Sequence, residues 1–188
     1  EKVGAVAAAT GAKVICETFP ARLERGAGRL APERLAYLAE MAVAQLDGLA
    51  HLVLVDAKSP VSFFAYPGKP SDLVPDGCRV HTLAGPGDDV MAALDALGFA
   101  GTAPLAPALR PERPEGGAPL TAQTLGEAIG ALLPEGAIVT DESNTSGLFI
   151  SGATAGAPPH DWLTLTGGSI GIGLPLATGA AVACPDRK

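Results

Sequence analysis

The chain has 188 residues, of which 47% are hydrophobic and 18% charged, so it can bury a sizeable core and does not have the composition of a disordered segment. A net charge of -7 without any dense cluster of Lys and Arg argues against a nucleic-acid or anionic membrane surface, since both need concentrated positive charge. The three cysteines are widely spaced and form no zinc-binding pattern, which is typical of reduced thiols in a cytoplasmic protein.

Predicted strands and helices alternate over the first half of the chain. Residues 13–18 and 51–56 are short apolar or β-branched runs, and helix-spaced Leu and Ala residues lie between them over 32–48. A strand over 78–83 and a helix over 88–97 continue the alternation. The pattern predicts a βαβ unit within a doubly wound parallel sheet, and therefore an α/β fold.

A proline-rich stretch divides the chain. Residues 102–118 carry four prolines, a density that removes backbone donors and disfavours regular elements. We interpret this stretch as an interdomain linker. Residues 1–101 are then expected to form one domain, whose first strand is missing because residues 3–9 read as a helix already under way, and residues 119–188 are expected to form the truncated beginning of a second α/β domain.

The second half contains two predicted strands that each lead into a loop suited to a ligand. A helix capped by Thr121 and ended by Pro134 precedes a strand over 137–141 and a polar turn over 142–146. A strand over 162–166 leads into a glycine-rich turn and then a helix. The run from 162 to 184 is about as long as a membrane span, but its glycines make it too weakly hydrophobic for one.

The two loops are expected at one edge of the sheet, because ligands of open parallel sheets bind outside the carboxyl ends of the strands. Residues 142–146 offer hydroxyl and amide donors that can hydrogen-bond to phosphate oxygens. Residues 167–173 lack most Cβ atoms, so their backbone can approach a flat ligand closely. Either loop alone is more often an ordinary turn or packing contact.

In this order and spacing, residues 139–145 (VTDESNT) and 167–179 (GGSIGIGLPLATG) resemble the thiamine-diphosphate-dependent enzymes that include acetolactate synthase and benzoylformate decarboxylase. Residues 10–28 resemble the central domain of the same enzymes. The resemblance implies that Asn144 and Thr145 lie near the diphosphate, that the Gly168 carbonyl accepts from the aminopyrimidine, and that Ile170 is the apolar wedge that keeps the cofactor bent. The implied cofactor-binding residues are Glu142, Ser143, Asn144, Thr145, Gly168, Ser169 and Ile170.

The resemblance further implies a 2-keto acid decarboxylase or carboligase that is a homodimer or homotetramer and requires Mg²⁺. Its metal ligands would follow Lys188 and its catalytic glutamate would precede Glu1, so this chain would hold no catalytic or metal-binding residue and would be inactive alone. Glu142 is not that glutamate, because it falls in a different loop.

Two alternatives from other classes stay open. Residues 26–31 (GAGRLA) match the G-x-G-x-x-A fingerprint of NAD- or FAD-binding modules, and Asp56 could hold a ribose, but the long gap between Thr18 and Gly26 does not fit a turn that must follow its strand directly. A noncatalytic scaffold is the second alternative. His51 and His81 are interpreted as hydrogen-bonded strand residues, not as catalytic bases.

Overall fold

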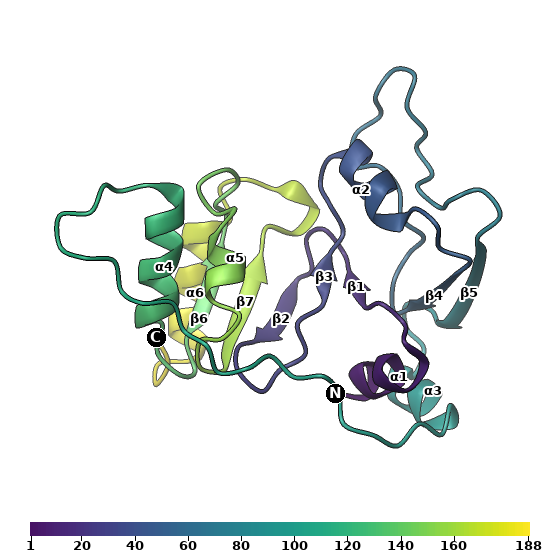
Figure 1. The fold of residues 1–188 in the computed structure, drawn as a ribbon, viewed down its shortest axis with the longest axis horizontal. Coiled ribbons are helices and arrows are strands. Elements are labelled where there is room, and N and C mark those ends of the chain that lie inside the picture. Colours follow the sequence, from purple (N-terminus) through teal and green to yellow (C-terminus); the bar gives the residue numbers. More distant parts are fainter. The chain divides into compact units, whose positions relative to one another are not determined.

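A computed structural model describes residues 1–188, which form two compact units (Figure 1). The N-terminal unit comprises Lys2–Thr18 and Pro32–Ala103, and the C-terminal unit comprises Glu1, Phe19–Ala31 and Pro104–Lys188. Both units combine helices with sheets that contain parallel strands, so the predicted α/β class is confirmed.

The N-terminal unit consists of short helices and two separate two-stranded parallel sheets, in which β1 pairs with β3 and β4 pairs with β5. Ala42 and Leu46 of its second helix pack with Leu73 in a small core that Ile15 and Leu35 help to cover. Its elements are α1 (Lys2–Thr10), β1 (Ile15–Cys16), β3 (Glu33–Arg34), α2 (Ala39–Leu46), β4 (His51–Val55), β5 (Arg79–Ala84) and α3 (Val90–Ala96).

The predicted βαβ unit is wrong in one respect, since its two strands lie in different sheets. Residues 33–34 are extended and pair with β1, so the helix expected from residue 32 begins only at Ala39. Side chains hold this stretch extended. Arg34 donates to the Thr18 carbonyl, and Gln45 donates to the Arg34 carbonyl and accepts from the Ala36 N–H. These bonds compete with the helical hydrogen bonds that the leucine spacing favours.

The C-terminal unit is built on one three-stranded sheet of order β2-β7-β6 (Figure 1). β6 and β7 are parallel and β2 is antiparallel to β7. Trp162, in the central strand, is fully buried. The elements are β2 (Arg22–Arg25), α4 (Ala122–Leu132), β6 (Ile138–Asp141), α5 (Ile150–Ala153), β7 (His160–Thr164), the 3-10 turn η1 (Thr166–Gly168) and α6 (Gly173–Ala183).

The grouping of contacts differs from the predicted boundaries at one segment. Phe19–Ala31, expected within the central domain, supplies β2 to the sheet of the C-terminal unit. Residues 102–118 contain no helix or strand, and Ala106 exchanges backbone hydrogen bonds with Gly28 and Arg29 after β2. The divisions 1–101, 102–118 and 119–188 stay a prediction for the whole protein.

The expected strand, glycine turn and helix are present over residues 160–183 as β7, η1 and α6. α6 spans 11 residues, and no helix of the chain has both the length and the apolarity needed to cross a bilayer. α4 begins at the predicted cap, where Thr121 and Thr124 form a reciprocal capping box.

Candidate functional site

The polar loop and the glycine turn lie at the same edge of the sheet. β6 and β7 run in parallel with Asp141 opposite Thr164, so both strands end at one level. Residues 142–146 follow the first strand and residues 167–173 follow the second. The expected convergence of the two loops is therefore confirmed, although the ligand-binding roles of their residues stay a prediction.

Glu142 fastens the two loops together. Its carboxylate accepts hydrogen bonds from the backbone N–H groups of Gly171 and Gly173, at the start of α6. The hydroxyl of Thr140 donates to the Gly173 carbonyl over 3.2 Å and adds a second link. A Cβ at Gly173 would lie 2.7 Å from a carboxylate oxygen of Glu142, so a larger residue here would require the Glu142 side chain to shift. In this structure Glu142 thus organises the turn, whereas the motif had assigned it to the cofactor.

The two backbone donors, Gly171 first and Gly173 second, lower the pKa of the Glu142 carboxyl because they bond the charged form. Because the pKa of Glu142 is lower in the folded state than in the unfolded state, the stabilisation that these two hydrogen bonds give is complete at pH values above the unfolded-state pKa of about 4.3. It is lost as the pH falls through the folded value. Glu142→Gln is therefore expected to lower the Tm by a few degrees at neutral pH, with a difference from the parent that shrinks in acid.

Thermal unfolding of the two proteins between neutral and acidic pH checks this expectation. Glu112→Gln, which removes an exposed carboxylate from the same unit, is the matched control and should leave the Tm almost unchanged at every pH. A Glu142→Gln deficit that persists undiminished at the acid end would contradict the charge argument.

Asp141, which sequence reasoning treated only as a strand end, shapes the polar loop. One of its carboxylate oxygens accepts from the backbone N–H and the hydroxyl of Ser143, at 2.9 and 2.5 Å. The other accepts from the indole N–H of the buried Trp162 at 3.1 Å. The signal in the sequence is an Asp followed two residues later by Ser, which is typical of an Asx turn.

Because Asp141 holds the Ser143 hydroxyl, the exposed side-chain donors of the polar loop are Asn144, Thr145 and Ser146. Their amide and hydroxyl groups are the kind that bond phosphate oxygens. Of the predicted residues in this loop, Asn144 and Thr145 are therefore free to face a ligand, while Ser143 and Glu142 are engaged within the protein.

The glycine turn presents backbone and one large apolar side chain. Gly167 and Gly168 have φ of 65° and 70°, in the left-handed region that glycine tolerates. Ser169 is exposed beside them, and Ile170 is 75% exposed. Residues 142–146 and 167–173 together are called the corner. The corner combines hydroxyl and amide donors, open backbone and an apolar side chain, and this combination fits a diphosphate joined to a flat heterocycle. No group of three or more His, Cys, Asp or Glu side chains is arranged to hold a metal ion.

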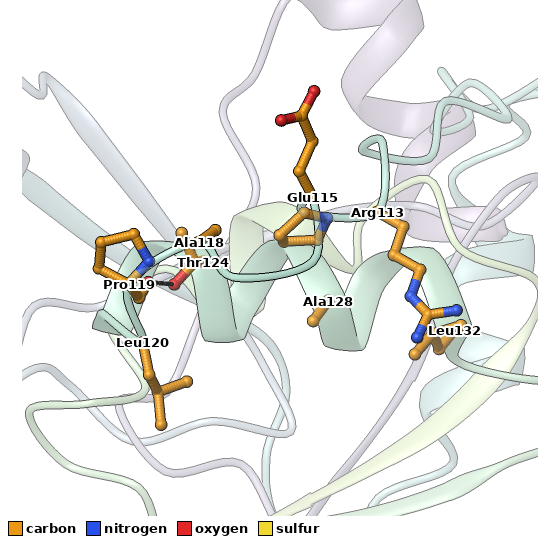
Figure 2. Close-up of a pocket in the computed structure, with 9 residues that line it drawn as sticks. Arg113, Glu115, Ala118, Pro119, Leu120, Thr124, Ala128 and Leu132 are labelled. Atoms are coloured by element: carbon orange, nitrogen blue, oxygen red, sulfur yellow. Dashed lines mark hydrogen bonds between the residues drawn. The ribbon is translucent and has the colours of Figure 1, made fainter.

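Two hollows in the C-terminal unit lie away from this corner. One of about 190 Å³ lies between α4 and the proline-rich stretch and is lined mainly by apolar groups, among them Leu120 and Leu132 (Figure 2). The other, of about 290 Å³, is lined by Arg22, Asp161 and Arg187, near the amino ends of the parallel strands. None of the predicted cofactor-binding residues lines either hollow.

The fold and the corner together define an α/β protein with a candidate ligand site at the carboxyl edge of two parallel strands. The chain is 64% identical over 182 residues to a candidate acetolactate synthase large subunit, IlvX, of Mycobacterium tuberculosis (strain ATCC 25618 / H37Rv), a match that covers 95% of the chain and 35% of the relative. It is 39% identical over 71 residues to the acetolactate synthase isozyme 1 large subunit of Escherichia coli (strain K12), over 37% of the chain and 13% of that relative.

No family model matches the chain. The chain spans about a third or less of the length of these curated relatives. Both relatives are named as acetolactate synthase large subunits, so the comparisons support an acetolactate-synthase-like relationship, in line with the resemblance of its loop motifs.

Proposed function

We propose that the protein carrying this chain is a thiamine-diphosphate-dependent, acetolactate-synthase-like enzyme that decarboxylates a 2-keto acid and acts as a decarboxylase or carboligase. The observation that carries the proposal is the joining of the polar loop and the glycine turn by Glu142 at one sheet edge. The similarity to two acetolactate synthase large subunits supports it. A cytoplasmic homo-oligomer is part of the same proposal.

Each exposed part of the corner has a role in this proposal. Asn144 and Thr145 donate hydrogen bonds to the diphosphate, and the Gly168 carbonyl accepts one from the aminopyrimidine. Ile170 supports the heterocycle and excludes water from its reacting side. When bound, thiamine diphosphate would supply the electron sink for decarboxylation. Mg²⁺ and the catalytic glutamate would be held by other parts of the protein, so the chain alone is proposed to be inactive.

The competing proposal of a dinucleotide site meets an obstacle in the turn after β2. The G-x-G-x-x-A fingerprint binds the pyrophosphate of a dinucleotide through free backbone N–H groups at the N-terminus of the helix that follows the turn. Here the N–H groups of Ala27, Gly28 and Arg29 donate to carbonyls of the protein itself, and the next element in the chain is the short strand β3. The observed geometry therefore favours thiamine diphosphate over NAD or FAD.

Thermal shift of the full-length protein tests the proposal. Thiamine diphosphate with Mg²⁺ is expected to raise the Tm, since a ligand at about 100 times its Kd stabilises by about 2.7 kcal/mol. Replacement of both Asn144 and Thr145 by Ala should raise the Kd by about tenfold or more, because two donors to a charged group are lost. Ser146→Ala is the matched control from the same exposed loop.

The alternatives give different outcomes in that experiment. Stabilisation by NAD or FAD alone would replace the proposal with the dinucleotide module. No stabilisation by any of the three ligands would favour the noncatalytic scaffold.

A further inference from the structure

Two exposed histidines face each other across the parallel pair β4 and β5. The register places His81 opposite Val53, and Val53 lies two residues after His51, so both imidazoles project from the same face of the sheet. The Nδ1 atom of His51 lies 3.0 Å from the Nε2 atom of His81. The ring centroids are 5.2 Å apart with an interplanar angle of 31°.

We propose that His51 and His81 form a bidentate binding site for a divalent transition metal that prefers tetragonal geometry, Cu²⁺ ahead of Ni²⁺. Imidazole nitrogen is a favoured ligand of these ions, and affinity rises from Ni²⁺ to Cu²⁺. With metal–nitrogen bonds of about 2.0–2.1 Å, two nitrogens 3.0 Å apart subtend roughly 90–97° at the metal. That angle matches neighbouring ligands of a tetragonal ion and is smaller than the tetrahedral angle that Zn²⁺ prefers.

Binding requires a tautomeric change within the pair. In the hydrogen-bonded pair one of the two facing nitrogens carries the shared hydrogen. A metal needs a lone pair from both, so His51 would carry its ring proton on Nε2 and His81 on Nδ1. Because both rings are exposed, they can rotate enough to direct these lone pairs to one ion.

The strand pair makes this a preorganised but weak chelate. Hydrogen-bonded neighbouring strands hold the two imidazoles together before the metal arrives. No third His, Cys, Asp or Glu joins them, so water would complete the coordination. The guanidinium of Arg79, directly opposite His51 in the register, opposes a dication through charge repulsion.

Titration of the chain with Cu²⁺, followed by calorimetry and electron paramagnetic resonance, tests the proposal. Cys16, Cys78 and Cys184 are first replaced by Ser, since thiols would bind or reduce the ion. One equivalent should bind with a spectrum that reports two imidazole nitrogens. His51→Gln and His81→Gln should each weaken binding by about tenfold or more, since each leaves a single ligand. Saturating Cu²⁺ should raise the Tm of the parent but not the Tm of either of these two variants.

Two further variants sharpen the test. Arg79→Gln should tighten binding, because it removes the opposing charge. His160→Gln is the control and should leave the affinity unchanged, since His160 is buried and bonds the Pro158 carbonyl. Undiminished affinity in the His51 and His81 variants, or a spectrum with a single nitrogen ligand, would overturn the proposal. The site lies in the N-terminal unit, and its test does not depend on the thiamine-diphosphate proposal.

Discussion

Gly26→Ala is expected to destabilise the C-terminal unit by about 3 kcal/mol or more, because it combines a strained backbone with overlap of packed atoms. Gly26 has φ of 107°, and a Cβ there would lie 2.6 Å from the Pro158 carbonyl oxygen and 2.7 Å from that of Ala157. These are backbone atoms and cannot turn aside. A shift would also break the 2.8 Å bond from the Ala27 N–H to the Ala157 carbonyl.

Gly28→Ala provides the matched control for this effect. Gly28 also has positive φ, 75°, but nothing lies within 4 Å of the position of its Cβ. Its replacement should therefore cost only the conformational strain, about 1 kcal/mol. Urea unfolding measures the free energy of unfolding of both variants. Equal losses of this free energy would show that the close approach of Gly26 to residues 157–158 does not affect stability.

Asp161→Asn is expected to remove about 2 kcal/mol from the free energy of unfolding, because it breaks a buried charge network whose arginines stay partly hydrated. Asp161 is 6% exposed. Its two carboxylate oxygens accept from Arg22 and Arg187, each at 2.7 Å. Arg187 in turn donates to the carbonyls of Gly136 and Ala137, so one carboxylate ties β2, β7 and the segment after α6 together.

The loss should depend on pH in a definite direction. Burial by itself raises the pKa of Asp161, but hydrogen bonds from Arg22 and Arg187, together with their charges, outweigh it and lower the pKa below its usual value. The stabilisation is therefore complete above the unfolded-state pKa of about 3.9 and is lost as the pH falls through the folded-state value. The gap between parent and variant in urea unfolding should close in acid. Asp186→Asn, at an exposed position, should show no gap at any pH.

Elements set by local chemistry could be predicted from the sequence. Thr121 begins α4 through contacts with Thr124, three residues away, and the glycine turn separates β7 from α6 as expected. The register of two parallel strands then places residues 142–146 beside residues 167–173 without further information. For these parts the determining residues lie within a few positions of one another.

Pairings between distant segments could not be predicted in the same way. Arg22 and Asp161 are 139 residues apart, and the strand that carries Arg22 reads RLER, with no run of apolar residues to indicate a buried sheet neighbour. The direction of the Glu142 side chain could not be predicted from the sequence either. A carboxylate in a polar loop can face a ligand or cap a nearby turn, and only the three-dimensional position of Gly171 decides between them.

The strand order of the C-terminal unit bears on how this module could be excised or grafted. An expression boundary placed in the proline-rich stretch would discard β2 and leave one side of β7 with unpaired backbone groups. It would also uncover Trp162, since Leu23 lies opposite it and the Arg25 guanidinium lies 4.9 Å from its ring centre. A soluble, transplantable version of the glycine-turn module must therefore carry Phe19–Ala31 along, for instance by circular permutation.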